Sequence, residues 1–140
     1  MKRIVTTEFI SSLVIFLFGY TAISKLLSID LFEAVLEQSP LISSGAALLA
    51  WQIPLAELGI VLLLIFSSTR KWGLWASALL LSLFTIYLGY MVLFSHHLPC
   101  SCGGVISNMS WPVHIVFNVV CIGTTVVAIR NLEKVEKDWE

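Results

Sequence analysis

Cysteine and histidine side chains gather in one short stretch of the sequence, residues 96–104. It holds Cys100 and Cys102, two of the three cysteines, and His96 and His97, two of the three histidines. Cysteines separated by one residue can form a disulfide only if the backbone turns, and a proline before them and two glycines after them allow such a turn. A strained, exposed disulfide is the kind that exchanges with partner thiols. The pattern therefore indicates a redox-active pair at Cys100 and Cys102.

Two other interpretations of this stretch stay open. A disulfide between Cys100 and Cys102 could be a static staple, although so short a loop removes little chain entropy. His96, His97, Cys100 and Cys102 could also bind zinc or copper, although adjacent histidines rarely reach one ion and the cysteine spacing is compressed for a tetrahedral site. The histidines could instead act on the thiols, because a nearby imidazolium raises the thiolate fraction of a cysteine.

The composition is that of a membrane protein. Of the 140 residues, 58% are hydrophobic and 12% are charged, and the mean hydropathy is +0.93. At roughly 20 apolar residues per span, the length allows about four membrane-spanning helices and no additional soluble domain. The formal net charge of −1 gives no basic patch for nucleic acid, so the expected surroundings are a lipid bilayer.

Four long apolar segments, at about 9–27, 41–68, 72–94 and 111–130, predict four spans in a single domain over residues 1–140. Between the first two, 28–39 has an amphipathic pattern that suits a short helix on the membrane surface. Residues 95–110 form the loop with the cysteines, and the charged tail after residue 130 should extend the last helix into water. The predicted fold is an all-α integral membrane four-helix bundle with a short periplasmic interfacial helix after the first span.

The positive charges predict the orientation of these spans. With four spans, one side of the membrane carries seven cationic side chains and the other carries only Lys25. The seven are Lys2, Arg3, Arg70, Lys71, Arg130, Lys134 and Lys137. By the positive-inside rule, both termini are cytoplasmic and the loop of Cys100 and Cys102 is periplasmic, in a bacterial inner membrane. Disulfides persist in the periplasm, which suits a redox pair there.

The fourth span carries a polar stripe. His114, Asn118, Cys121 and Thr125 follow one another at helical spacing, so they should share the face that points into the bundle. Hydrogen bonds between helices would explain the stripe, and so would a proton relay or ligand contact at His114. Cys121 lies about 10 Å deeper than His114, too far to pair easily with the loop cysteines.

Glu57 is the one acidic residue inside a span. A carboxylate within the membrane is costly and is by default a candidate functional group. Glu57 could be protonated, paired with a histidine, or paired with Lys25 from the first span. Counting from residue 41, however, puts Glu57 past the middle of the bilayer, whereas Lys25 lies near its outer end. Direct pairing would require a second span that starts late. We therefore expect an interior polar role for Glu57 and leave its partner unassigned.

Three segments together resemble a known family. They are Gly19 to Lys25 at the end of the first span, Pro54 to Glu57 in the second, and Cys100 to Gly104 in the loop. In this combination the chain resembles the MauE branch of the DoxX-like membrane proteins over nearly its whole length. Members often have Cys-x-Cys-Phe-Gly, whereas here Gly103 follows Cys102 directly.

The resemblance implies periplasmic thiol redox chemistry beside a thioredoxin-like partner. The layout is also similar to quinone-linked disulfide-forming enzymes of the VKOR and DsbB type, which use two cysteine pairs where this chain has one. Two hypotheses follow. The first is a redox protein that exchanges electrons between a periplasmic thioredoxin-like or substrate protein and the membrane, with a quinone near His114. The second is a non-catalytic membrane subunit or metal-binding anchor that uses the same loop.

Overall fold

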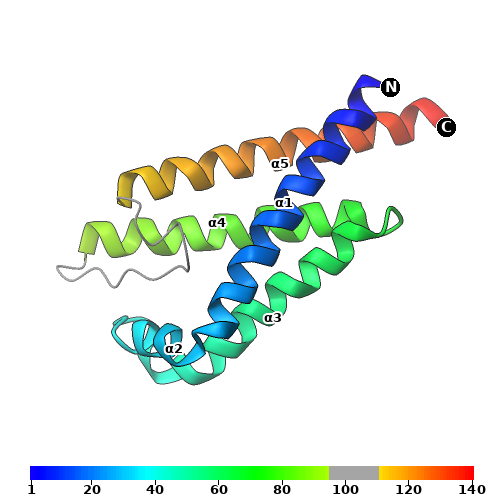
Figure 1. Ribbon diagram of the computed structural model, residues 1–140. Coiled ribbons are helices and arrows are strands. Elements are labelled where there is room, and N and C mark those ends of the chain that lie inside the picture. Colours follow the sequence, from blue (N-terminus) through cyan, green and yellow to red (C-terminus); the bar gives the residue numbers. More distant parts are fainter. Residues whose placement is uncertain (95–110) are drawn as a thin grey trace.

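The computed structural model describes residues 1–94 and 111–140, and every regular element in them is helical (Figure 1). The elements are α1 (Lys2–Leu27), α2 (Ile29–Glu37), the 3-10 turn η1 (Ser43–Gly45), α3 (Ala46–Ile65), α4 (Arg70–Phe94) and α5 (Trp111–Trp139). Four helices are long and apolar enough to cross a membrane. The predicted all-α four-helix membrane bundle is confirmed, and α2 is the short helix expected after the first span.

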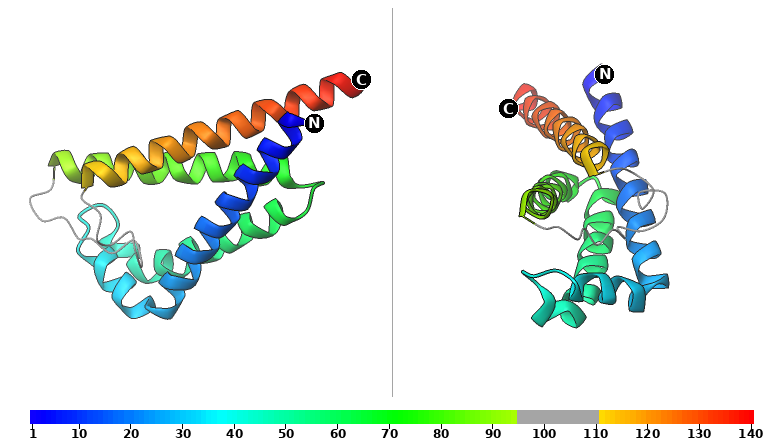
Figure 2. Two further views of the ribbon diagram at one scale, coloured as in Figure 1. Left: turned by 45° about the horizontal axis from the view of Figure 1, so that its top comes forward. Right: turned by 90° about the vertical axis from the view of Figure 1, so that its left-hand side faces the viewer.

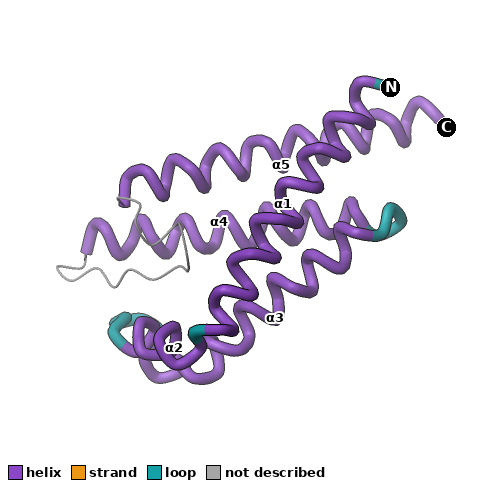
Figure 3. The backbone as a smooth tube through the Cα atoms, in the orientation of Figure 1, coloured by secondary structure: helices purple, strands orange, loops and turns teal. Residues whose placement is uncertain are grey.

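The four long helices run alternately up and down. α1 packs against α3 and α5, α4 packs against α5 and α3, and α2 packs against α3. Both chain termini lie at the same end of the bundle, which we call the terminal end (Figure 2). The opposite end, where α2 lies and where α4 ends and α5 begins, is called the α2 end. Figure 3 shows how little of the described chain lies outside helices.

The helices begin and end at other residues than the apolar pattern alone indicates. α1 already begins at Lys2, and α5 continues through the charged tail to Trp139 as a single helix. At 1.5 Å per residue, helices of this length exceed the roughly 30 Å of bilayer hydrocarbon. Their polar ends therefore extend beyond the apolar layer. α3, in contrast, begins only at Ala46, after the 3-10 turn.

Apolar side chains fill the interior and also cover the outside. A main cluster joins α1, α3, α4 and α5, and a second cluster joins α2 to the start of α3. Large side chains such as Phe16, Leu48, Leu83 and Val116 are exposed on the outer faces. A helix that is apolar on both its inner and outer faces is expected in lipid rather than in water. The main cluster comprises Ile10, Val14, Phe18, Ile60, Leu64, Leu74, Leu81, Ala128 and Ile129.

A tight turn joins α3 to α4 at the terminal end. The Thr69 hydroxyl donates to the Leu63 carbonyl over 2.8 Å, and Nε of Arg70 donates to the Leu64 carbonyl over 3.2 Å. These bonds satisfy two carbonyls that the end of α3 would otherwise leave without a partner. Just beyond, a Cβ atom added to Gly73 would lie 2.9 Å from the Leu64 side chain, so glycine permits the close approach of the two helices.

Ion pairs connect three helices at the terminal end. Arg70 of α4 bonds to Glu8 of α1. Lys71 of α4 lies 2.6 Å from Glu136 of α5, and a further pair at 3.6 Å joins Arg3 to Asp138. Three of the seven cations predicted to be cytoplasmic thus have acidic partners, in the second turn of α1 or in the charged tail of α5. Exposed pairs of this kind stabilise a fold only slightly.

Candidate functional site

Lys25 and Glu57 form an ion pair inside the bundle. Nζ of Lys25 lies 2.5 Å from Oε1 of Glu57, and the two side chains are only 4% and 7% exposed. From the sequence, Glu57 had no assigned partner, and pairing with Lys25 required a second span that starts late. α3 does start late, and the lean of the two side chains also brings them together.

Two features of the helices close the gap in depth. α3 starts at Ala46 rather than at residue 41, which brings Glu57 closer to the α2 end by about 7.5 Å at 1.5 Å per residue. Side chains also lean toward the N-terminus of their own helix. Since α1 and α3 run in opposite directions, Lys25 leans into the bundle and Glu57 leans toward the α2 end. The two side chains therefore approach each other.

Aromatic rings surround the Lys25 ammonium on two further sides. Nζ lies 5.6 Å from the ring centroid of Phe32 in α2 and 5.6 Å from that of Phe84 in α4. Both distances fall within the range of a cation–π interaction, which is strongest where water is excluded. The charge of one side chain from α1 thus interacts with groups from α2, α3 and α4.

The polar stripe of α5 faces the interior, as predicted. His114 and Asn118 are 3% and 4% exposed, and Thr125 is fully buried. The Thr125 hydroxyl donates to the Cys121 carbonyl over 2.7 Å. Cys121 itself is half-buried and carries a free thiol.

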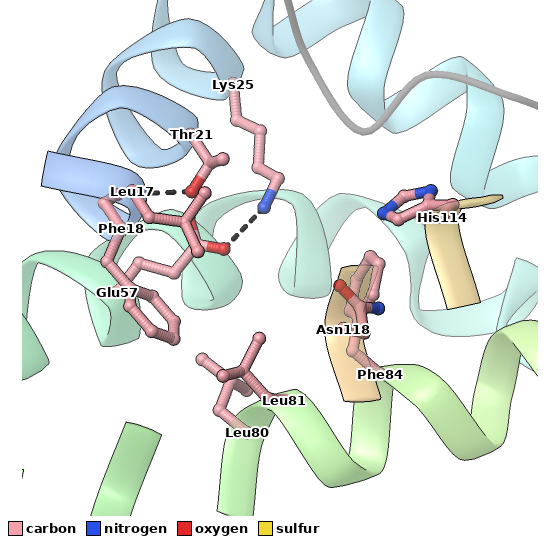
Figure 4. Close-up of a pocket in the computed structure, with 10 residues that line it drawn as sticks. All are labelled: Leu17, Phe18, Thr21, Lys25, Glu57, Leu80, Leu81, Phe84, His114 and Asn118. Carbon is pink, nitrogen blue, oxygen red and sulfur yellow. Dashed lines mark hydrogen bonds and ion pairs between the residues drawn. The ribbon is translucent and has the colours of Figure 1, made fainter. Parts of the chain in front are cut away.

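The ion pair and the stripe meet at one small cavity of about 50 Å³ (Figure 4). α1 contributes Lys25, α3 contributes Glu57, and α5 contributes His114 and Asn118. Two polar atoms at this cavity, Oε2 of Glu57 and Nδ2 of Asn118, are buried without a hydrogen-bond partner among the described residues. The remaining lining is Leu17, Phe18, Thr21, Leu80, Leu81 and Phe84.

Three residues of this site were not predicted from the sequence: Thr21, Phe32 and Phe84. Thr21 lines the cavity and donates to the Phe18 carbonyl over 3.2 Å. Phe32 and Phe84 look like ordinary apolar positions of their helices, and only their placement around an ammonium gives them a role. The helical spacing from Thr21 to Lys25 is the one pattern that could have linked two of these side chains.

An apolar groove adjoins the cavity. It has a volume of about 370 Å³ and lies between α1 and α5, and Leu17 lines both the groove and the cavity. Cys121 lines this groove and is not among the residues that line the polar cavity. Besides Leu17 and Cys121, the groove is lined by Phe9, Ile10, Leu13, Val14, Phe16, Phe117, Val120 and Thr124.

The predicted redox or metal-binding residues His96, His97, Cys100 and Cys102 lie outside the described residues. The structure describes their flanks, and both flanks lie at the α2 end, where the polar cavity also lies. Within residues 1–94 and 111–140, no group of three histidine, cysteine or acidic side chains could hold a metal ion.

The fold and this site define a small four-helix membrane protein with a buried cluster of charged and polar side chains. The family model described as "Methylamine utilisation protein MauE" matches residues 2–130. The chain therefore belongs to the MauE family, as the resemblance of its three segments predicted. Neither a curated protein nor a solved structure matches it significantly.

Proposed function

We propose that this MauE-family protein is a membrane thiol–disulfide redox protein. In this proposal, Cys100 and Cys102 exchange with a thioredoxin-like protein or another protein substrate in the periplasm, and electrons pass between this pair and the membrane. The observation that carries the proposal is the polar cavity at the α2 end, the end at which both flanks of the cysteine segment lie.

A purely structural explanation accounts poorly for this cavity. Packing four helices in lipid does not require a lysine, a glutamate, a histidine and an asparagine in one place, and polar groups within a membrane are costly to bury. Two of their atoms also lack partners among the described residues, so hydrogen bonding between helices does not explain the cluster fully. Such groups are typical of functional sites.

The exchange itself needs only the two cysteines. A thiolate of the partner attacks one sulfur of the Cys100–Cys102 disulfide, and a mixed disulfide forms while the other cysteine leaves as a thiolate. The second thiol of the partner then resolves the mixed disulfide, so that the partner is oxidised and the loop pair is reduced. In either direction, returning the pair to its starting state moves two electrons and two protons between the thiols and the membrane.

A membrane quinone would supply the two-electron acceptor or donor for that return step. The chain's own residues suit such a group. Nδ2 of Asn118 has no partner among residues 1–94 and 111–140 and could donate to a carbonyl oxygen, and the neighbouring groove between α1 and α5 is apolar enough for an aliphatic tail. His114 lines the same cavity as Asn118. Polar groups beside an apolar groove are what an amphipathic ligand requires.

The proposed location is the bacterial inner membrane, with both termini in the cytoplasm. Both termini lie at the same end of the bundle, which supports an even number of membrane crossings. The excess of lysine and arginine at that end supports its cytoplasmic location. The cysteine loop would then face the periplasm, where a disulfide is stable.

The test is to count free thiols in the purified full-length protein in lipid nanodiscs. A maleimide reagent that adds mass to each free thiol is applied after reduction, after treatment with a short-chain quinone analogue, and after mixing with a thioredoxin. We expect two thiols to disappear with the quinone analogue and to reappear with reduced thioredoxin. Cys121→Ser is the matched control, because it removes the one thiol outside the loop and should leave the cycle intact.

Variants with one remaining loop cysteine identify the attacking sulfur. Each of Cys100→Ser and Cys102→Ser should be tested against a thioredoxin that lacks its resolving cysteine and carries its remaining cysteine as a disulfide with an aromatic thiol. The remaining loop thiolate attacks that cysteine, the aromatic thiolate leaves, and a mixed disulfide accumulates. Thiols that stay free, or a bridge that resists mild reductants, would contradict the redox function. Stoichiometric zinc or copper bound by the unoxidised loop would instead favour the metal-binding anchor.

A further inference from the structure

The buried cavity contains more polar groups than the Lys25–Glu57 ion pair needs. We propose that it is a hydrated proton-transfer site, in which water links Asn118 to Glu57 and the Glu57 carboxylate takes up and releases a proton. This inference rests on the proposed function only for the source of the protons, which would be the thiol pair.

The size and polarity of the cavity suit water. A cavity must offer about 10–15 Å³ to hold one water molecule, together with two to four polar partners. This one measures about 50 Å³, which is room for a few water molecules. Nδ2 of Asn118 is a donor and Oε2 of Glu57 is an acceptor, and both lack a partner among the described residues. Water can accept from the first and donate to the second.

The charge balance of the cavity also favours a neutral ligand. The ammonium of Lys25 and the carboxylate of Glu57 compensate each other at 2.5 Å. An added anion would lie beside the carboxylate and an added cation beside the ammonium, each at a cost in a medium of low dielectric constant. Water carries no net charge, and it can transfer a proton.

The proton step balances without any other reactant. A proton that reaches a cavity water leaves that water and forms a new O–H bond at Oε2 of Glu57, so the carboxylate becomes a neutral acid and the water is restored. The reverse step returns the proton to the water. For each disulfide formed in the loop two protons are released, and Glu57 would carry them one at a time.

The aromatic rings explain how Lys25 tolerates a neutral Glu57. When the carboxylate is protonated, the ammonium loses its counter-charge but keeps the rings of Phe32 and Phe84, each 5.6 Å from Nζ. Cation–π attraction is largest for a desolvated cation. The two rings therefore lower the cost of the protonated state of Glu57.

Only two other titratable groups line the cavity among the described residues. They are Lys25 from α1 and His114 from α5, whereas α4 contributes Leu80, Leu81 and Phe84. His114 lies in the first turn of α5, at the α2 end, nearest to the loop cysteines in sequence. It is thus the side chain placed to pass protons between the flank of the loop and the cavity.

Infrared difference spectroscopy tests the carboxyl group directly. Full-length protein in lipid nanodiscs is compared before and after oxidation of its thiols. We expect a carboxylic-acid band that changes with the redox state, shifts in D₂O and disappears in Glu57→Gln. Glu8→Gln is the matched control, because Glu8 is an exposed acid of α1 in an ion pair with Arg70. Redox-coupled proton release, followed with an indicator dye, should slow by about 100-fold or more in Glu57→Gln.

Asn118→Leu tests the role of water without removing the carboxyl group. It replaces the free donor by an apolar side chain of similar volume, so the Glu57 band should remain while its exchange in D₂O slows by about tenfold or more. This measurement needs only acidification of the buffer and no thiol chemistry, so it holds even if the loop does not cycle. If the Glu57 carboxyl group of this variant exchanged with D₂O at the wild-type rate, the proposal that water links Asn118 to Glu57 would be overturned.

The outcomes separate this inference from the proposed function. Thiols that cycle with no change in the Glu57 band, and with normal proton release in Glu57→Gln, would overturn proton transfer and leave the redox function standing. Thiols that never cycle, with a Glu57 band that titrates and exchanges through water, would overturn the redox function and leave the hydrated site standing.

Discussion

Nζ of Lys25 and Oε1 of Glu57 lie 2.5 Å apart inside a bundle that otherwise buries mostly apolar side chains. The two residues come from the antiparallel neighbours α1 and α3 and are 32 positions apart in the sequence. A buried ion pair does little for net stability, because desolvation offsets the attraction. Removing one member has a much larger effect, because the other charge is then left in a medium of low dielectric constant.

We therefore predict strong coupling between these two residues. Lys25→Met alone should lower the free energy of unfolding by about 3–5 kcal/mol. The double variant Lys25→Met with Glu57→Leu should recover most of that loss, because two apolar side chains fill the space without an unpaired charge. Unfolding of the purified protein in detergent micelles, arranged as a double-mutant cycle, measures the coupling. Additive effects of the two substitutions would show that the side chains do not interact.

Much of the fold follows from the sequence because lipid imposes simple rules. A helix in a bilayer must satisfy its backbone internally, so long apolar runs give the four helices directly. Their ends were harder to predict. α1 already begins at Lys2 because ion pairs and water stabilise the polar turns before the apolar layer, and hydropathy alone does not register those turns. The extension of the last helix through the charged tail was predicted and is confirmed.

The site was predictable only in part, for a physical reason. The stripe of His114 and Asn118 is periodic within one helix, so the sequence reveals its buried face. The pairing of Lys25 with Glu57 depends on where α3 begins and on how two antiparallel helices lean their side chains. Neither property is encoded in the local pattern around Glu57. The predicted roles of His96, His97, Cys100 and Cys102 remain predictions.

The contact of α3 with α4 depends on Gly73. Gly73→Ala should destabilise the protein, because the new Cβ would lie 2.9 Å from the fully buried Leu64 and 3.1 Å from Cβ of Leu63. Overpacking of this kind costs about 1–3 kcal/mol. Gly89→Ala in the same helix is the control: it has open space and should stabilise by up to about 1 kcal/mol through helix propensity. Thermal unfolding that ranks the two variants in the opposite order would disprove this packing argument.

Tyr87 ties α4 to the segment after α2. Its hydroxyl donates to the hydroxyl of the fully buried Ser39 over 2.7 Å. Tyr87→Phe should cost about 1–3 kcal/mol, because Ser39 then keeps a buried polar atom without that donor. Adding Ser39→Ala should restore part of the loss. Tyr90→Phe, at a more exposed ring of the same helix, should have a smaller effect, and equal effects would argue against the bond.

The ion pairs at the terminal end should respond to salt, unlike the buried pair. Lys71→Gln removes the exposed contact with Glu136, so the loss of stability should be small and should vanish as the ionic strength rises. The destabilisation caused by Lys25→Met should persist in the same salt series, because ions do not reach a buried charge. Unfolding measured at low and high salt compares the two variants. A salt effect of equal size in both would mean that salt ions from the bulk solvent reach Lys25.

Cys121 should be dispensable for redox exchange. Its thiol is free and half-buried, and it borders the apolar groove between α1 and α5 and not the polar cavity. A thiol in apolar surroundings behaves as a small hydrophobic group, so Cys121→Ala should leave the thiol cycle of the loop unchanged. Labelling distinguishes the two environments: a charged, membrane-impermeant maleimide should modify the reduced loop thiols, whereas Cys121 should react only after the protein is unfolded. Loss of the cycle in Cys121→Ala would mean that electrons pass through this third cysteine, and the one-pair mechanism would then have to be abandoned.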